Sequence, residues 1–470
     1  MHSEREMNKI RVQEIIEATG GRMLCGIPEA VVSGVCHDSR ECRPEDLFVA
    51  IIGENQDGHR YVKQVLENGC RAVLVSEEGE WLKLAEERNA AVIKVEDTVY
   101  AMGELAKYYL DTLNVKKIAV TGSVGKTSVR DMIYYVLKEK YRCGRNLKNY
   151  NNFIGLPLSI FQFDDSLDVV VLEMGMSDFG EIDRLAGIVK PQIGVITNIG
   201  VAHMESLGSR EGIFQAKMEL AKHIEGACGM PGTLVYASDP EFLTKERTTG
   251  AYQQISVGET KENDYIISSV DDFGLDGIKF RLDHLGEIHQ VHLPLPGRHN
   301  AINSAIAIAV GDMLGLSPEE EDRGLAEADL TGNRLKKRQN GEVCVIDDTY
   351  NASPDSMKSA LRVLESSSCD GRRIAVLGDM YELGEHSEAQ HFDVGRFAGE
   401  CSIDALIGIG RQAEEICRGA EQNGLQTAYY EKKEDFYQDK DQFIGNGDII
   451  LVKGSRGMKM EQVVEHILKQ

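Results

Sequence analysis

The stretch Ile118-Ala119-Val120-Thr121-Gly122-Ser123-Val124-Gly125-Lys126-Thr127-Ser128 runs from an apolar strand pattern into a glycine-containing turn. The next apolar residues recur at helical spacing and share one face: Val129, Met132, Ile133, Val136 and Leu137. Backbone N–H groups of such a turn, at a helix N-terminus, point together at an anion. Lys126 would add a charge for the β- and γ-phosphates, and the Thr127 hydroxyl a ligand for Mg²⁺. Residues Gly122, Ser123, Val124, Gly125, Lys126, Thr127 and Ser128 are therefore predicted to bind a nucleotide.

The spacing of this loop departs from the usual phosphate-binding pattern. That pattern has four residues between its first Gly and its Gly-Lys pair, whereas here Ser123 and Val124 alone separate Gly122 from Gly125. A tight strand-to-helix turn without a ligand is the alternative. The position between a strand and an amphipathic helix favours nucleotide binding.

Composition bounds the class of protein. The 470 residues suffice for roughly three domains of ordinary size. Apolar residues make up 42% and charged residues 27%, as in ordinary globular proteins. The formal net charge of −24 argues against nucleic acid or an anionic membrane as the main partner.

The cysteines and the N-terminus indicate a cytoplasmic protein. The ten cysteines include no Cys-x-x-Cys pair, so the sequence indicates neither a zinc site nor a disulfide framework. The first eleven residues are polar, and no apolar run approaches the ~18 residues of a membrane span. We therefore expect neither a signal peptide nor membrane insertion.

Three α/β blocks are predicted: a smaller N-terminal domain at 1–110, a central domain at 111–332 and a C-terminal domain at 333–470. The central block is expected to be a doubly wound sheet with a phosphate loop, and the last a Rossmann-like sheet. The strand-like runs are 46–51, 71–75, 118–121, 169–172, 193–197, 343–346, 374–377, 405–409 and 449–452, and the helical patterns include 102–110 and 182–189.

Residues that directly follow strands carry the functional signal in such sheets, because ligands bind outside the carboxyl ends of parallel strands. Glu173 follows the run 169–172, and His203 lies in the loop after 193–197. A carboxylate beside a phosphate loop can hold Mg²⁺, which prefers oxygen ligands. We interpret Glu173 as a metal ligand, with a capping carboxylate as the alternative. His203 is placed near the metal, with a packed or surface histidine as the alternative.

Several motifs in combination resemble the Mur ligases over nearly the whole chain. They are Thr-Gly-Ser-x-Gly-Lys-Thr at 121–127, Glu-Met-Gly at 173–175, Asn-Ile-Gly-x-Ala-His at 198–203, Gly-x-His-Asn-x-x-Asn at 297–303 and Asp-Asp-x-Tyr-Asn-x-x-Pro-Asp-Ser at 347–356. Within that family, the segments 347–357, 377–384 and 453–456 are similar to the MurF type. The resemblance implies an ATP-dependent ligase that joins D-alanyl-D-alanine to UDP-N-acetylmuramoyl-tripeptide, a peptidoglycan precursor, in the cytoplasm and as a monomer.

Two related ligases are weighed as alternatives. A MurE-type ligase would be expected to carry an Asp-Asn-Pro-Arg segment and a Lys-Gly-His-Glu ending, and the chain has neither. A folylpolyglutamate-synthetase-like ligase shares the central block, but the Asp-Ser-Arg segment of the first block argues against it. A nucleotide-binding protein without ligase activity is a third alternative, disfavoured by the intact Lys126, Glu173, His203 and Lys217.

The resemblance also implies roles in the central block. These ligases form an acyl phosphate from ATP, so Lys126 would neutralise phosphate while Thr127 and Glu173 hold one Mg²⁺. His203 would lie near a second metal ion. Lys217 matches a position where the family often carries a carbamylated lysine, an oxygen ligand for that metal; without the resemblance it reads as a solvated helix residue.

The remaining implied contacts lie on both sides of the loop. Asn300 matches the adenine site, whereas Asn303 could instead pack in the following helix. Arg334, at the start of the third block, matches a residue that meets ATP when the domains close, with a surface arginine in a linker as the alternative. The segment 330–333 is the expected hinge.

The UDP substrate would be bound by Ser39, Arg40, Asp57, His59, Asn149 and Asn152, with Asp38 orienting Arg40. Asp348 is assigned to the nucleotide, and Tyr350 and Asn351 to the dipeptide. Ser353 and Pro354 are interpreted as a helix start.

Overall fold

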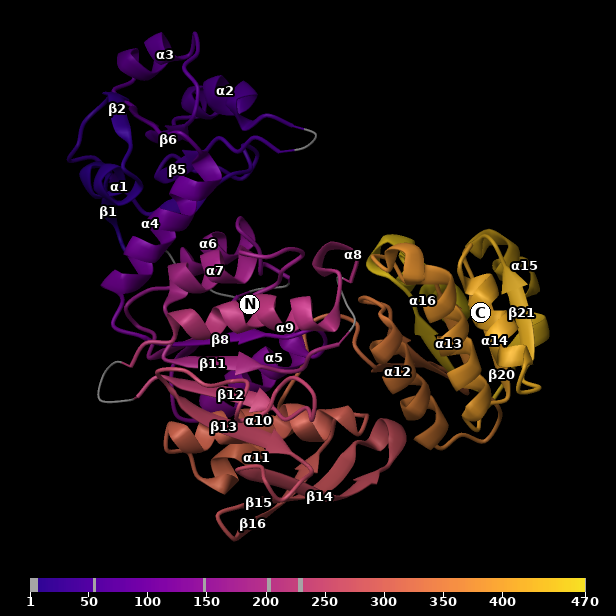
Figure 1. Cartoon of the computed structure of the whole chain (residues 1–470). Coiled ribbons are helices and arrows are strands. Elements are labelled where there is room, and N and C mark those ends of the chain that lie inside the picture. The colour runs from indigo at the N-terminus through magenta and orange to yellow at the C-terminus, as the bar shows by residue number, and fades with distance from the viewer. Residues whose placement is uncertain (1–6, 54–55, 147–148, 201–203, 227–230, 470) are drawn as a thin grey trace.

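The computed structural model describes residues 7–53, 56–146, 149–200, 204–226 and 231–469. Figure 1 shows three α/β lobes, with the N-terminal and C-terminal lobes both adjoining the central one. Each lobe is built on its own sheet. The predicted class of fold is confirmed.

The N-terminal lobe is a five-stranded sheet in the order β2-β7-β6-β5-β4. Four strands are parallel and β2 is antiparallel to β7. The strands are β2 (Arg22–Cys25), β4 (Gly34–Cys36), β5 (Asp46–Val49), β6 (Ala72–Val75) and β7 (Ala91–Lys94), and β1 (Ile10–Arg11) pairs with β3 (Val31–Val32). The helices are α1 (Val12–Thr19), η1 (Gly58–Tyr61), α2 (Val62–Glu67), α3 (Leu82–Glu87) and α4 (Thr98–Thr112). Helix α4 packs on α1 and also on α6 and α7 of the next lobe, so it runs past residue 110 and joins the two lobes.

The central lobe is a nine-stranded sheet in the order β16-β15-β14-β13-β12-β11-β8-β10-β9. Its strands are β8 (Lys116–Thr121), β9 (Cys143–Arg145), β10 (Val169–Glu173), β11 (Ile193–Ile196), β12 (Thr233–Ala237), β13 (Gln253–Gly258), β14 (Tyr265–Asp272), β15 (Ile278–His284) and β16 (Glu287–Leu293). Its helices are α5 (Lys126–Leu137), α6 (Gly155–Ile160), α7 (Glu181–Val189), α8 (Met204–Leu207), α9 (Arg210–Met218), η2 (Glu219–His223), η3 (Gly274–Asp276), α10 (His299–Met313) and α11 (Pro318–Ala326).

Helices cover both faces of the central sheet. In β8, Ile118 and Val120 pack with the buried residues of α5 and α10, whereas Ala119 packs with those of α7. Successive side chains of a strand point to opposite faces, so a strand buried on both faces must be apolar throughout. This explains the continuous apolar run that predicted the strand.

The C-terminal lobe is a six-stranded sheet in the order β17-β18-β22-β19-β20-β21, parallel except for β17. Its strands are β17 (Lys336–Asn340), β18 (Val343–Asp348), β19 (Arg373–Gly378), β20 (Ala405–Ile409), β21 (Gln426–Tyr430) and β22 (Ile449–Lys453). Its helices are α12 (Pro354–Ser366), η4 (Gly384–His386), α13 (Ser387–Glu400), α14 (Ala413–Glu421), α15 (Lys433–Phe443), η5 (Arg456–Met458) and α16 (Glu461–Leu468). Helix α12 begins at Pro354 after Ser353, whose N–H donates to Ser356 Oγ over 2.9 Å, so the predicted helix start is confirmed.

Some strands were not predicted from the sequence. Strands β14, β15 and β16 extend the central sheet with antiparallel pairs, and β17 adds an antiparallel edge to the C-terminal sheet. An edge strand needs no apolar stripe, and the sequence of β17 is Lys-Lys-Arg-Gln-Asn. In the described part of the chain, no helix is long and apolar enough to cross a membrane.

Candidate active site

The loop between β8 and α5 requires glycine at two positions. Gly122 has a φ of 152° and Gly125 a φ of 84°, and L side chains rarely adopt this region. A Cβ on Gly122 would also lie 1.9 Å from Thr197 Oγ1. The chain therefore turns tightly against β11 before it enters α5, and the first N–H groups of α5 lack partners within the helix.

Two residues after β11 hold this loop in place. Asn198 Oδ1 accepts hydrogen bonds from the N–H groups of Ser123 (3.1 Å) and Val124 (2.9 Å). The Val124 carbonyl accepts from Thr197 Oγ1 (2.6 Å) and Asn198 Nδ2 (3.0 Å). Asn198 begins the motif at 198–203, but no local pattern predicted this role for it. Its position directly after a strand adjacent to β8 was the available signal.

Lys126 lies folded over the loop. Its Nζ donates to the carbonyl oxygens of Gly122 (2.7 Å) and Ser123 (3.2 Å). Burial lowers the pKa of Lys126, while the nearby Glu173 acts in the opposite direction. The ammonium group is thus held where the phosphates of a nucleotide on this loop would lie.

Glu173 ends β10 next to the loop and is 2% exposed. Its Oε1 accepts from Asn151 Nδ2 over 2.8 Å, and its Oε2 lies 3.4 Å from Arg130 Nη1. Among the described residues, nothing donates a hydrogen bond to Oε2. A buried carboxylate oxygen with spare acceptor capacity suits a hard divalent cation.

Lys217, on α9, is 1% exposed. Burial, and secondarily the charge of Lys126, place its pKa well below the ordinary lysine value. In the described part of the chain, no hydrogen bond or ion pair involves the side-chain nitrogen of Lys217, whereas its backbone carbonyl accepts from the Glu219 N–H. This environment favours the neutral amine, and Lys217 is not the solvated helix residue that the sequence suggested without the resemblance. His203 lies outside the described residues.

The start of α10 adjoins the loop through an asparagine pair. Asn300 Nδ2 donates to the Pro296 carbonyl over 2.8 Å, and its Oδ1 accepts from Asn303 Nδ2 over 2.9 Å. A Cβ on Gly125 would lie 3.1 Å from Asn303 Oδ1. Asn303 therefore packs against the phosphate loop, while the Asn300 amide bonds within the protein.

Arg334 links the third lobe to the loop. Its Nη2 donates to Thr127 Oγ1 over 3.1 Å, and its guanidinium lies 4.5 Å from the centre of the Tyr350 ring. Behind it, Lys453 Nζ donates to Asp348 Oδ2 (2.6 Å) and to the Asn351 carbonyl (2.8 Å). The predicted residues of the third lobe thus lie together: Arg334, Asp348, Tyr350 and Asn351. Because Arg334 bonds to Thr127 of the central lobe, it is not an arginine on the surface of a linker.

A buried ion pair on α5 is hydrogen-bonded to Thr331 of the expected hinge segment. This ion pair was not predicted from the sequence. Arg130 and Asp131 are both fully buried. Asp131 Oδ2 accepts from the Thr331 N–H over 2.6 Å, and Arg130 Nη2 donates to Thr331 Oγ1 over 2.9 Å. Since Arg130 also lies beside Glu173, this pair connects the hinge with the candidate metal ligand. Two adjacent charges within an amphipathic helix pattern were the available signal.

Of the asparagines expected at the substrate, Asn149 is exposed, and Asn152 Oδ1 accepts from the Gly155 N–H over 2.8 Å at the start of α6. Asn151, which precedes Asn152, is the asparagine that bonds to Glu173. The resemblance indicated the segment but could not select the residue, because the choice depends on the fold of the loop.

The first-lobe residues divide into two groups. Arg40 is largely exposed and its Nε donates to Asp38 Oδ1 over 2.9 Å, with Ser39 between them, as expected for Asp38 orienting Arg40. His59 is 8% exposed: its Nδ1 lies 2.7 Å from Asp57 Oδ1, and its Nε2 accepts from the Ser76 N–H over 3.0 Å. Both ring nitrogens of His59 are thus used inside the lobe.

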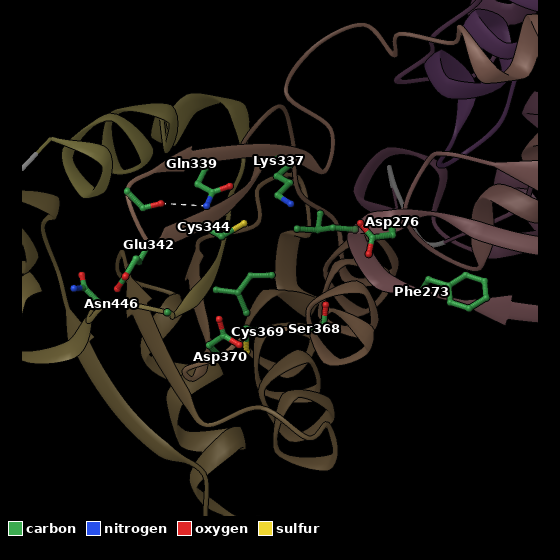
Figure 2. Close-up of a pocket in the computed structure, with 14 residues that line it drawn as sticks. Phe273, Asp276, Lys337, Gln339, Glu342, Cys344, Ser368, Cys369, Asp370 and Asn446 are labelled. Carbon is green, nitrogen blue, oxygen red and sulfur yellow. Dashed lines mark hydrogen bonds between the residues drawn. The ribbon is translucent and has the colours of Figure 1, made fainter.

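A separate cavity of about 550 Å³ lies between η3 of the central lobe and β17 and β18 (Figure 2). Its lining includes Phe273, Asp276, Lys337, Gln339 and Cys344. None of the predicted site residues lines it, so it does not serve the phosphate loop.

Comparisons with known proteins cover all three lobes. Family models match in order: "Mur ligase family, catalytic domain" at 31–110, "Mur ligase middle domain" at 120–311 and "Mur ligase, glutamate ligase domain" at 333–456. The UDP-N-acetylmuramoyl-tripeptide–D-alanyl-D-alanine ligase of Bacillus subtilis is 38% identical over 447 residues, 94% of each chain. The crystal structure of MurF from Acinetobacter baumannii has a TM-score of 0.91 at 30% identity, covering 99% of this chain and 100% of that one. MurF ligase from Thermotoga maritima, in complex with ADP, has a TM-score of 0.81 at 28% identity, covering 93% and 97%.

Proposed function

This chain belongs to the Mur ligase family, and from that premise we propose that it joins D-alanyl-D-alanine to UDP-N-acetylmuramoyl-tripeptide at the expense of ATP. The relatives that it matches over most of its length carry the name of this reaction. The observation that carries the proposal within the structure is the Arg334–Thr127 contact, which brings the third lobe to the phosphate loop. The product is the pentapeptide precursor of peptidoglycan.

The residues present suit transfer of the γ-phosphoryl group to a carboxylate. Two anions must approach each other, so the protein contributes charge neutralisation and positioning. Lys126 neutralises the phosphate on the loop built by residues 122–128, and Asn198 keeps that loop in shape. Arg334 supplies a second cation from the third lobe. The amine of the dipeptide then attacks the acyl phosphate and releases phosphate.

We assign Mg²⁺ to Thr127 Oγ1 and Glu173, supported by the spare acceptor capacity of Glu173 Oε2. When bound, the ion offsets phosphate charge. His203 and a carbamylated Lys217 are proposed for a second ion. A buried, neutral amine is the form of lysine that adds CO₂, and the carbamate would provide the oxygen ligands that Mg²⁺ prefers.

The substrate contacts follow the placement of the side chains. Ser39 and Arg40 are proposed to bind the UDP moiety, because an arginine fork suits a pyrophosphate. Asp57 and His59, whose side chains lie 2.7 Å apart, are proposed to belong to the same UDP-substrate site. Asn149 and Asn152 are proposed to contact the muramoyl part of that substrate. The adenine site is assigned to the start of α10, with Asn300 positioned through its internal bonds. Asp348 positions Lys453 near the nucleotide, and Tyr350 and Asn351 face the dipeptide.

The cytoplasm is the inferred compartment, because the reaction consumes ATP and the described cysteines are free thiols. The domain limits 1–110, 111–332 and 333–470 are retained as a proposal. That the enzyme acts as a monomer stays a prediction, which light scattering would check.

ADP release is the direct test. The purified chain is given ATP, Mg²⁺ and UDP-N-acetylmuramoyl-tripeptide whose third residue is either lysine or meso-diaminopimelate, with and without D-alanyl-D-alanine. We expect ADP release that depends on both substrates and a product heavier by the dipeptide. Release that requires a UDP-muramoyl-dipeptide and a single amino acid instead would assign the MurE reaction and overturn the proposal.

A further inference from the structure

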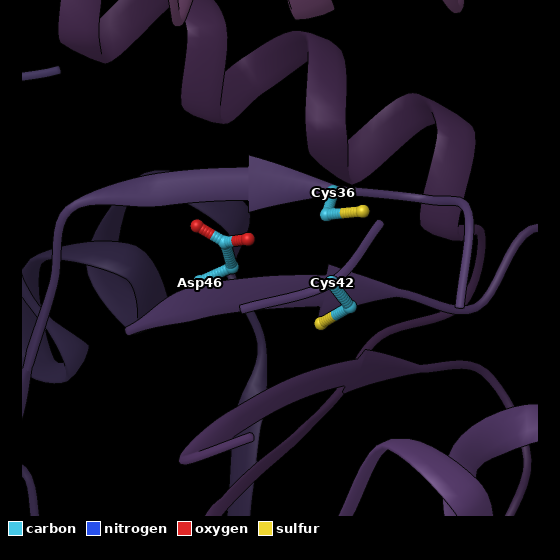
Figure 3. Close-up of side chains that lie close together, drawn as sticks. All are labelled: Cys36, Cys42 and Asp46. Carbon is cyan, nitrogen blue, oxygen red and sulfur yellow. The ribbon is translucent and has the colours of Figure 1, made fainter. Parts of the chain in front are cut away.

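Two cysteines and an aspartate of the N-terminal lobe lie together, away from the phosphate loop. The Sγ atoms of Cys36 and Cys42 and a carboxylate oxygen of Asp46 all lie within 4.8 Å of one another. Figure 3 shows the three side chains on neighbouring segments of one sheet edge. No Cys-x-x-Cys spacing marks these donors in the sequence, because the pairing of β4 with β5 brings them together.

The register of two parallel strands builds this cluster. Gly34 of β4 pairs with Asp46 of β5, and Cys36 follows Gly34 on the same face. A Cβ on Gly34 would lie 2.1 Å from Asp46 Oδ1, so the glycine makes room for the carboxylate. Cys42 comes from the loop that connects the two strands. The cluster is thus held at both ends of the segment 37–41.

A third thiol extends the cluster inward. Cys70 is 4% exposed, and its Sγ donates to the Asp46 carbonyl over 3.4 Å. The Sγ atoms of Cys36 and Cys42 lie within 4.8 Å of each other. Cys36 and Cys42 are half-buried, so the cluster can be reached from solvent.

We propose that Cys36 Sγ, Cys42 Sγ and the Asp46 carboxylate bind one zinc ion, with the fourth position open to water. Thiolate and carboxylate donors suit Zn²⁺, whereas Mg²⁺ selects oxygen donors and would not compete. Zinc–sulfur bonds of about 2.3 Å require the donors to approach by roughly 1 Å, which the loop carrying Cys42 can supply. Each thiol releases its proton to solvent as its bond to zinc forms.

A zinc ion bound here would restrain the segment 37–41, which lies between Cys36 and Cys42. Ser39 and Arg40 lie between the two cysteine ligands, so a bound ion would fix both ends of the segment that carries them. Zinc binding itself does not depend on the ligase assignment: it can be measured without nucleotide or muramoyl peptide. Failure of the site and failure of the proposed reaction would therefore be separate results.

Metal titration tests the site on the full chain. The protein is reduced with a phosphine, stripped with a chelator and titrated with Co²⁺ as a spectroscopic probe, then with Zn²⁺ in competition, both in excess Mg²⁺. We expect one equivalent of Co²⁺ with thiolate-to-cobalt charge-transfer absorption, displaced by Zn²⁺. Cys36→Ser and Cys42→Ser should each raise the zinc Kd about 100-fold or more, since even outer-shell changes cost about 10- to 100-fold.

Cys25→Ser is the matched control, because Cys25 is a half-buried thiol of the same sheet on β2, at the opposite edge from β4. It should bind zinc as the unaltered chain does. Circular dichroism checks that each variant is folded. A second readout is alkylation by iodoacetamide, read by peptide mass: zinc should protect Cys36 and Cys42 but not Cys25. Unchanged zinc affinity in the Cys36→Ser, Cys42→Ser double variant, no charge-transfer band, or no protection would overturn the proposal.

Discussion

Arg334 Nη2 and Thr127 Oγ1 are 3.1 Å apart, although 207 positions separate the residues in sequence. Thr127 belongs to the first turn of α5 and Arg334 to the start of the third lobe. The hydroxyl that would ligate Mg²⁺ thus also accepts a hydrogen bond from the residue that would meet ATP. The proposed nucleotide site is therefore shared between two lobes, and it would be complete only when the segment that connects them holds Arg334 next to the phosphate loop.

Removing the loop lysine should abolish ligation without unfolding the chain. Lys126→Ala deletes a cation that bonds only to loop carbonyls among the described residues. Losing one well-placed electrostatic contact typically costs about 10²- to 10³-fold in rate. We expect at least that loss in steady-state ADP release, with an unchanged circular dichroism spectrum. Near-normal turnover would rule out the phosphate-loop assignment.

The activity lost on substitution of Lys217 should be partly rescued by small carboxylic acids. Lys217→Ala should be inactive, and formate or acetate should restore part of the activity, because an external carboxylate can replace the oxygen ligands of a carbamate. The readout is ADP release against carboxylate concentration. Lys222→Ala is the control: this neighbouring lysine is exposed and pairs with Asp183, so it should keep its activity and not respond to the acids. Full activity of Lys217→Ala would count against the carbamate.

The sequence predicted the elements whose apolar runs are continuous. Strands β8, β10 and β11 are buried on both faces, so their β-branched runs stand out without any tertiary information. Strand β17 is polar throughout and forms only because β18 offers it an edge. The predicted limits at 110 and 332 came from the order of motifs, and α4 crosses the first of them.

The sequence could predict those residues of the candidate site whose chemistry follows from their residue type and their place after a strand. Gly122, Lys126 and Glu173 follow from position after a strand. Asn151 and Asn198 could not be selected in this way, since their partners, Glu173 and the loop amides, are far away in sequence. The proximity of Cys36 to Asp46 depends on the register of β4 and β5, in which Gly34 pairs with Asp46, and no local pattern encodes that register.

A buried carboxyl group should make stability depend on pH. Glu321 is fully buried, and burial raises its pKa from 4.5 to about 9. The folded state then binds one more proton than the unfolded state between these values. This contribution is fully present below the unfolded pKa and is lost as pH rises toward 9, by up to about 1.4 kcal/mol per pH unit. Stability should therefore fall across this window.

Glu321→Gln tests that dependence. The amide stays neutral, so the variant should be more stable than the unaltered chain at pH 8 by a few kcal/mol and nearly equal to it at pH 5. Urea unfolding at both values measures the difference. Glu319→Gln, an exposed position in the same first turn of α11, should leave the change in stability between pH 5 and pH 8 as it is in the unaltered chain, because Glu319 is ionised throughout that window. Equal slopes for Glu321→Gln and the unaltered chain would show that Glu321 is not the group responsible.

The last prediction concerns closure about the segment 330–333. Gly332 has a φ of 87°, and a Cβ there would lie 2.6 Å from Tyr350 Cδ2. Thr331 is meanwhile fastened to Asp131. The backbone of this segment can thus change its direction only at Gly332 and the residues after it. Closure of the third lobe on the central lobe would exclude the water that hydrolyses an acyl phosphate. Small-angle scattering should show a smaller radius of gyration with a non-hydrolysable ATP analogue and UDP-muramoyl-tripeptide than without ligands.

Gly332→Ala should impair this motion, because the new methyl group strains the backbone and meets the Tyr350 ring. We expect a smaller change in radius and a lower kcat, with folding verified by circular dichroism. Gly286→Ala is the matched control: its φ is 86°, but nothing lies within 4 Å of its Cβ position, in the turn between β15 and β16. It carries the same backbone strain without the contact, so kcat should be preserved. An unchanged radius at saturating ligand in the unaltered chain would refute closure, and equal effects of the two variants would remove Gly332 from it.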